Sequence, residues 1–218
     1  MVGSAKVFFQ FFLAAVSFPQ TAEEYFYRGN QKSEKGDFNG AIDDYTKSIE
    51  LEPSSPGTYN NRGNAYFALK KLALALDDYS KAIELKPDFN TAYNNRGKVN
   101  FSLKKYEDAI DDFSKAIELK RDFVAAYFER GNAYLQMKKF KEAIDDYTSA
   151  IERTINYADA YNNRGAAYLG IGNVDDAIKD FTKAIEVKPA FADSYMMRGT
   201  IYFNQKDYPN AEKIFPNI

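Results

Sequence analysis

The sequence of 218 residues contains no histidine, no cysteine and no tryptophan. Without histidine and cysteine, the chain lacks the usual zinc ligands, the usual general base near neutral pH and any thiol nucleophile. It also lacks an excess of charge of one sign, because 29 Lys and Arg residues face 31 Asp and Glu residues. Nucleic-acid binders normally carry a clustered basic excess. We therefore expect a protein that is not an enzyme and that has no cofactor, no metal and no nucleic-acid partner.

Long apolar runs are missing as well. The longest run, residues 7–16, is too short for a transmembrane helix, which needs about 20 apolar residues. Lys6 precedes this run and Ser17 follows it, an order that resembles a secretory signal peptide. We predict that residues 1–17 are a signal peptide and that the mature chain is exported, periplasmic or secreted, without stable membrane insertion. In the alternatives, the segment is an apolar extension that packs on the rest of the chain, or a boundary inside a longer protein, and the chain is cytoplasmic.

What the sequence does contain is a pattern that recurs every 34 residues. In each unit a glycine follows a tyrosine by four residues, an alanine follows it by sixteen and a second aromatic by twenty. The best-formed unit, residues 92–120, carries two helical periodicities of apolar residues separated by a polar break. We predict helix-turn-helix units that start near residues 22, 56, 90, 124, 158 and 192, the last one incomplete. The tyrosines are Tyr25, Tyr59, Tyr93, Tyr127, Tyr161 and Tyr195.

The glycine of each unit needs a packing role, because a glycine within a helix costs about 1 kcal/mol relative to alanine. Counting along an antiparallel hairpin places Gly97 opposite Ala109, twelve residues later. Two small residues that face each other let the two helix backbones approach closely. We therefore expect a glycine–alanine contact in every unit, with the large Tyr and Phe side chains on either side.

The order of tyrosine, glycine, alanine and second aromatic at this period resembles the tetratricopeptide repeat family. The resemblance covers residues 22–215, nearly all of the domain that we expect to span residues 18–218. It implies an all-α fold, a right-handed α-α superhelix (a solenoid) of about six helix-turn-helix repeats. In this family the first helices line a concave surface that typically binds peptides or assembles complexes. Ile155 replaces the family's closing proline in the fourth unit, so we expect a looser junction there.

On the first helix of each unit, the face away from the packing tyrosine and glycine is rich in amide side chains. A ladder of amides offers both donors and acceptors to the N–H and C=O groups of an extended peptide. The resemblance therefore implies a peptide-binding groove on this face. Alternatively, the asparagines are solvated, bridge adjacent helices, or are neutral copies left by internal duplication. The expected groove residues are Asn60, Asn61, Asn64, Asn94, Asn95, Lys98, Phe128, Asn132, Asn162 and Asn163.

An arginine directly precedes the glycine of every unit. Counting equal distances from the turn places each arginine level with an aspartate on the second helix, which predicts a structural ion pair within each of the first five units. A basic stripe for phosphate or acidic ligands is the rival interpretation, but the aspartates would neutralise it. In the sixth unit Lys213 stands at this place, so Arg198 should lack its partner. The expected pairs are Arg28 with Asp44, Arg62 with Asp78, Arg96 with Asp112, Arg130 with Asp146, and Arg164 with Asp180.

Together these features predict a non-enzymatic scaffold that holds an extended polypeptide, a protein or peptide of unknown identity, in an Asn-lined concave groove. Two alternatives stay open. Met196 and Met197 make the last unit apolar, and uncapped repeat ends of this kind favour a self-assembling homo-oligomer. The chain could also be the targeting module of a larger protein.

Overall fold

The computed structural model describes residues 21–214, so the expected signal peptide, residues 1–17, lies outside the described residues. Within the described range the secondary structure is entirely helical, and no helix there is long and apolar enough to cross a membrane. The helices are α1 (Ala22–Glu34), α2 (Phe38–Leu51), α3 (Pro56–Ala68), α4 (Leu72–Leu85), α5 (Asn90–Ser102), α6 (Tyr106–Leu119), α7 (Val124–Gln136), α8 (Phe140–Arg153), α9 (Ala158–Gly170), α10 (Val174–Val187), α11 (Ala192–Asn204) and α12 (Tyr208–Ile214).

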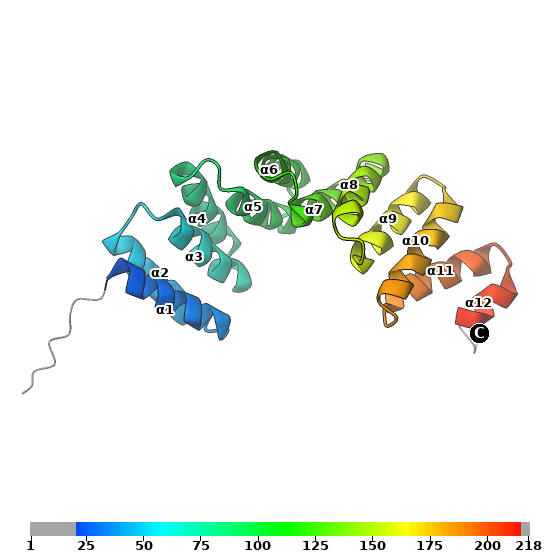
Figure 1. Cartoon of the computed structure of the whole chain (residues 1–218), viewed down its shortest axis with the longest axis horizontal. Coiled ribbons are helices and arrows are strands. Elements are labelled where there is room, and N and C mark those ends of the chain that lie inside the picture. The colour runs from blue at the N-terminus through cyan, green and yellow to red at the C-terminus, as the bar shows by residue number, and fades with distance from the viewer. Residues whose placement is uncertain (1–20, 215–218) are drawn as a thin grey trace, which may run out of the picture.

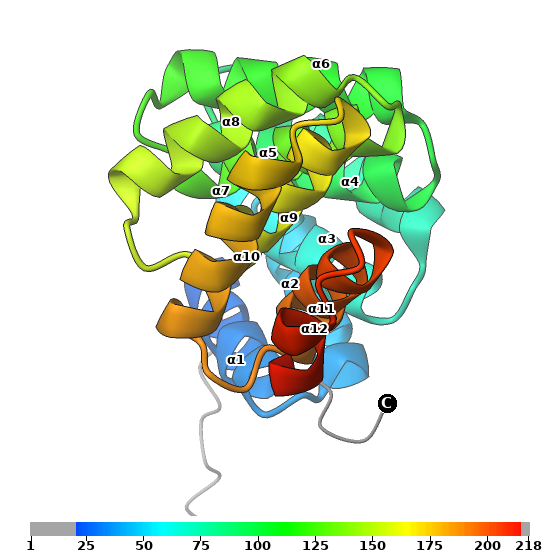
Figure 2. The same cartoon turned by 90° about the vertical axis from the view of Figure 1, so that its right-hand side faces the viewer.

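The helices stack in chain order. Each odd-numbered helix packs on the even-numbered helix that follows it, and that helix packs on the next odd-numbered one. Figure 1 shows the pairs following one another along an arch, from the blue N-terminal pair to the red C-terminal pair, and Figure 2 shows the same stack from its end. The odd-numbered helices α1 to α9 also touch one another from pair to pair, which places them on the inside of the curve. The expected all-α helical-repeat superhelix is therefore confirmed.

In the first five units the side chain nearest the repeat glycine is the second aromatic of its unit. A Cβ atom added to Gly97 would lie 2.7 Å from the ring of Phe113, and one added to Gly29 would lie 2.6 Å from the ring of Tyr45. Helical side chains lean toward the N-terminus of their helix, so a ring sixteen residues after the glycine reaches back to its level. The alanine also packs toward the next unit, where Ala75 lies in a buried cluster with Val99.

The junction after the fourth unit is not loose, contrary to the expectation from Ile155. That side chain is 70% exposed and contributes little to packing. However, α8 packs on α9 as extensively as α6 packs on α7. The Tyr157 ring lies 4.8 Å from the ring of Phe128, measured between centroids, and fills the space between α7 and the start of α9. The junction therefore packs as its neighbours do without the proline.

The turn between the two helices of a unit contains one residue with a left-handed backbone. In the first and fifth units this residue is a glycine, Gly36 with φ 80° and Gly172 with φ 79°. In the other units it is a lysine, namely Lys70, Lys104, Lys138 and Lys206, with φ between 57° and 60°. A side chain in this conformation costs about 1–2 kcal/mol, whereas glycine adopts it freely.

This difference predicts the effect of exchanging the two residue types. Lys104→Gly should raise the free energy of unfolding by about 0.5–1 kcal/mol, because the relief of backbone strain exceeds the extra entropy of glycine in the unfolded chain. The reverse change, Gly172→Lys, should lower it by a similar amount. Equilibrium unfolding in urea measures both. A Lys104→Gly chain that is less stable than the parent would contradict the argument.

Candidate functional site

The arginines that precede the glycines pair with the aspartates sixteen residues later. Arg62 donates from Nε and Nη2 to the two carboxylate oxygens of Asp78, at 2.8 and 2.7 Å. Asp78 is buried, and so are the other four aspartates of this series. All five expected partners lie within ion-pair contact, and they are Arg28 with Asp44, Arg62 with Asp78 at 2.7 Å, Arg96 with Asp112 at 2.7 Å, Arg130 with Asp146 at 2.7 Å, and Arg164 with Asp180 at 2.8 Å.

Four of these arginines, and Arg198 of the sixth unit, also have a partner that the sequence reasoning missed. Arg62 Nη1 donates to the hydroxyl of Thr46 on α2, in the preceding unit, at 3.1 Å. Ser80, Ser114, Thr148 and Thr182 receive the same bond from the next arginine in turn. One guanidinium therefore joins its own helix to two others. The signal was present in the sequence, because a Ser or Thr directly follows each of these second-helix aromatics.

Burial and pairing act against each other at the aspartates. Burial raises the pKa of Asp78, and the hydrogen bonds and charge of Arg62 offset only part of that rise. Burial likewise raises the pKa of Asp112 and Asp146 against the effect of their arginines. With the guanidinium groups directed at buried carboxylates, the structure does not offer the basic stripe that was the rival interpretation.

Arg198 is the exception in this series, as expected. The residue sixteen positions after it is Ile214, which corrects the alignment that placed Lys213 there. Arg198 Nη1 still donates to Thr182 at 2.9 Å. Its buried Nε has no hydrogen-bond partner within residues 21–214. The sixth unit thus supplies a natural control for the ion pairs of the other five.

Removing the arginine should therefore have unequal effects in different units. Arg130→Met leaves Asp146 buried and unpaired, which should lower the free energy of unfolding by about 3–5 kcal/mol. Arg198→Met loses one hydrogen bond to a hydroxyl and should cost about 1 kcal/mol. Urea unfolding of the two variants gives the comparison. Adding Asp146→Leu to the first variant should recover most of its loss, and equal losses in the two single variants would refute the pairing.

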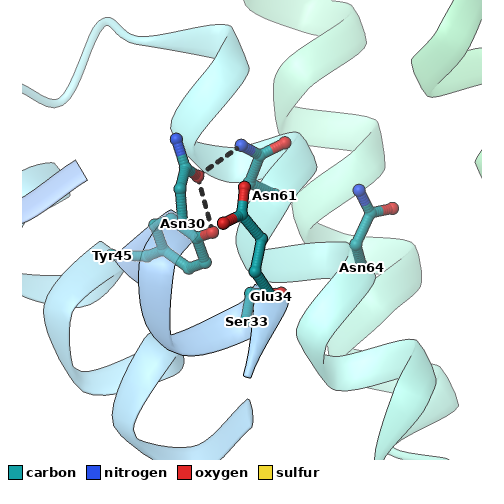
Figure 3. A pocket seen from close by; sticks show the side chains of 6 residues that line it. All are labelled: Asn30, Ser33, Glu34, Tyr45, Asn61 and Asn64. Carbon is teal, nitrogen blue, oxygen red and sulfur yellow. Dashed lines mark hydrogen bonds between the residues drawn. The ribbon is translucent and has the colours of Figure 1, made fainter. Parts of the chain in front are cut away.

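A second network joins the odd-numbered helices. The hydroxyl of Tyr45 donates to Asn30 Oδ1 at 2.7 Å, and the same oxygen accepts from Asn61 Nδ2 of the next unit at 3.0 Å, as Figure 3 shows. We name this arrangement a Tyr–Asn–Asn bridge. Two more bridges repeat it, Tyr79–Asn64–Asn95 at 2.8 and 3.0 Å and Tyr147–Asn132–Asn163 at 2.8 and 2.9 Å.

The three positions of a bridge change together along the chain. The third and fifth units have Phe113 and Phe181 in place of the tyrosine, so no hydroxyl is available there. In these two units the asparagine that would accept from the hydroxyl is replaced by Lys98 and Ala166, and the asparagine of the following unit by Glu129 and Met197. Asparagines therefore occupy these positions in the units whose tyrosine hydroxyl can donate a hydrogen bond to them. This favours the alternative in which some of the expected groove asparagines bridge adjacent helices.

The remaining expected groove residues divide into two groups. Asn60 and Asn94 are only 5% and 6% exposed, so the expectation that they line an open surface is wrong for these two. Adjacent residues of a helix point about 100° apart, so Asn60 faces inward when Asn61 faces the groove. Phe128 is half-buried beside Tyr147 and Tyr157. The residues that stay at least partly accessible on the odd-numbered helices are Asn61, Asn64, Asn95, Lys98, Asn132, Asn162 and Asn163.

The bridges leave some amide groups unused. Within residues 21–214, no hydrogen bond engages the Nδ2 groups of Asn30 and Asn64 or the Oδ1 atom of Asn95. Asn30, Asn61 and Asn64 line an open pocket of about 350 Å³ on the odd-numbered helices, together with Ser33, Glu34 and Tyr45. In Figure 3 the unused amino group of Asn30 points away from the drawn hydrogen bonds.

Burial of the Tyr45 hydroxyl makes stability depend on alkaline pH. Burial raises the pKa of Tyr45 from its ordinary value of 10.0 to about 12. The unfolded chain loses this proton first, so stability is retained below pH 10 and falls as the pH rises toward 12. Tyr45→Phe should cost about 1 kcal/mol at pH 9 through the lost hydrogen bond. The difference in free energy of unfolding between the parent and the variant should become smaller at pH 11. Urea unfolding at the two pH values measures it, and a difference that does not change with pH would contradict the prediction.

Comparison with known proteins agrees with this architecture. Tetratricopeptide repeat models match residues 56–89, 91–123, 158–191 and 192–215, and a further TPR repeat model matches residues 29–70 and 131–172. The chain belongs to the tetratricopeptide repeat family. Members of this family are protein-interaction scaffolds, and the chain is one of them by its fold and its repeats.

Several solved and curated proteins are similar to it. The crystal structure of MamA is 32% identical, covers 77% of this chain and 92% of its own, and superposes with a TM-score of 0.71. YrrB, described as a TPR protein with an unusual peptide-binding site, is 24% identical over 81% of this chain and 91% of its own, with a TM-score of 0.70. RNA polymerase II-associated protein 3 of Homo sapiens is 43% identical over 47 residues, which is 22% of this chain and only 7% of that protein.

Proposed function

We propose that the chain holds an extended polypeptide along the surface of its odd-numbered helices, and that it acts by binding rather than by catalysis. These helices lie on the inside of the arch, where one extended segment can contact several units at once. YrrB, which shares this fold, is described as having a peptide-binding site. The signal-peptide pattern of residues 1–17 extends the proposal to an exported protein.

The observation that carries the proposal is the set of oriented, unused amide groups. The hydroxyl of Tyr79 donates to the Asn64 carbonyl oxygen, which also accepts from Asn95 Nδ2, and together the two bonds hold this end of the Asn64 amide inward. The amino group of Asn64 is then left to face the groove, and Asn95 Oδ1 offers an acceptor nearby on the next helix. Groups fixed in this way bind without a further cost of ordering the side chains.

Such groups recognise the backbone of a bound chain. The N–H and C=O groups of an extended peptide alternate along it, and amides can pair with either. Because Asn30 and Asn64 occupy the same position in consecutive units, their amino groups repeat along the groove. The main chain of the partner therefore supplies most of the common affinity, and its side chains supply selectivity.

Replacing Asn30 and Asn64 by Asp tests this role directly. Each Asp keeps an oxygen that can accept from the tyrosine and from the next asparagine, but it has no amino group. We expect the double variant to bind twelve-residue peptides, selected from a random library on the parent chain, at least about tenfold more weakly. Fluorescence anisotropy with labelled peptides measures the affinity, and circular dichroism shows whether helicity is retained.

Asn39→Asp is the matched control, because Asn39 is exposed on α2 and makes no hydrogen bond within the described residues. It should leave the affinity unchanged. Unweakened binding by the double variant would reject the groove, as would failure of the parent to select any peptide. Light scattering on the same samples examines the self-assembly alternative, which the exposed Met196, Phe203 and Tyr208 of the last unit favour.

A further inference from the structure

The junction between α5 and α7 differs from the others in its polar contacts. The Oδ1 atom of Asn94 on α5 is buried and has no hydrogen-bond partner within the described residues. The residue as a whole is only 6% exposed. A buried carbonyl without a donor costs about 1–3 kcal/mol, so native structures rarely leave one unpaired. The missing donor therefore needs an explanation.

The preceding junction shows what is missing. There, Asn60 Oδ1 accepts a hydrogen bond from Asn95 Nδ2 of the next unit at 3.1 Å. The residue that corresponds to Asn95 one unit later is Glu129. A carboxylate accepts hydrogen bonds and donates none, so Glu129 cannot replace the amino group. With the Asn94 amide in its present orientation, two acceptors thus stand where the equivalent junction has an acceptor and a donor.

The chain itself does not supply a strong donor to Glu129. Asn132 Nδ2 approaches its carboxylate at 3.3 Å, and no ion pair within residues 21–214 involves Glu129. Lys98 stands at the position that corresponds to Asn64, one turn along α5 from Asn94, but it makes no ion pair with Glu129. The junction therefore presents a half-buried negative charge whose hydrogen-bonding capacity is largely unused.

We propose that the α5–α7 junction is a specificity site for one basic side chain, Lys or Arg, of the polypeptide bound in the groove. The cationic N–H groups supply the donors that Glu129 and, after a small rotation, Asn94 lack. A bound chain removes water from the Glu129 carboxylate, and only a charged partner compensates that loss well. This inference rests on the proposed function and adds the chemistry of one residue of the partner.

The surroundings of Glu129 suit a long basic side chain. Phe128, next to it in sequence, stacks near Tyr157 with 4.8 Å between ring centroids. Burial and, to a smaller extent, the charge of Glu129 raise the pKa of Tyr157 to about 12. An aliphatic stem can lie along the rings while its charged end reaches the carboxylate.

Selection from a random library of twelve-residue peptides tests the proposal. The parent chain, Glu129→Asn and the control Glu152→Asn are each immobilised at full length; Glu152 is exposed on α8 and has no hydrogen bond or ion pair within the described residues. We expect Lys or Arg to be enriched at one peptide position on the parent and the control, and not on Glu129→Asn. Replacing that basic residue by norleucine should weaken binding to the parent at least tenfold and leave binding to Glu129→Asn unchanged.

A second measurement does not depend on peptides. Glu129→Asn restores a donor opposite Asn94, so its thermal midpoint should rise, whereas that of Glu152→Asn should not. Lys98→Gln should retain the basic preference, since Lys98 is not the partner of Glu129. Peptides that bind without enrichment of Lys or Arg, or an enrichment that survives in Glu129→Asn, would overturn this inference and leave the groove intact. Failure of the parent to bind any peptide would overturn both.

Discussion

In the second to fifth units, the arginine that precedes the repeat glycine holds three helices in one register, and the inner surface of the arch depends on that register. Arg62 lies on α3, pairs with the buried Asp78 of α4 and donates to Thr46 of α2. The guanidinium cannot shift without leaving a buried charge unpaired, which costs about 3–5 kcal/mol. Equivalent side chains in consecutive units therefore meet at the same spacing, and the asparagine contacts between units repeat at 3.0, 3.0 and 2.9 Å.

The periodicity of the sequence predicted which residues of the two helices lie level with each other. It did not predict contacts that depend on the length and direction of a side chain. Equal counting from the turn placed Arg96 level with Asp112, and the two are in contact at 2.7 Å. The same counting did not foresee that the ring of Phe113 leans back along its helix and becomes the nearest neighbour of Gly97. Counting fixes the level of a Cα atom. It does not say how far a ring or a guanidinium extends, which is also why the bonds to Thr46 and its equivalents were missed.

Sequence position was also insufficient to predict which asparagines are accessible in the candidate groove. Neighbouring asparagines were assigned to one surface, yet Asn60 is buried while Asn61 is half-buried and bridges to α1. One amide can hold helices together and still keep a group for binding. The carbonyl of Asn64 accepts from Tyr79 and Asn95, while its amino group stays unused within the described residues. Structural and binding roles are therefore not exclusive for these amides. The bridge uses the carbonyl oxygen of the asparagine as an acceptor, and these hydrogen bonds fix the direction in which its amino group points.

Because the repeats are equivalent, a junction that differs from the others can be compared with its neighbours in the same chain. At the α3–α5 junction, Asn95 donates to both Asn60 and Asn64, which shows what the scaffold uses to satisfy an inward-facing asparagine. At the α5–α7 junction, Asn94 is kept while its donor is exchanged for Glu129, and the carbonyl is left unpaired. An asparagine at position 129 would remove that cost without disturbing the register. The donor that Asn94 and Glu129 both lack in the free chain is what the proposed basic side chain of a bound polypeptide supplies.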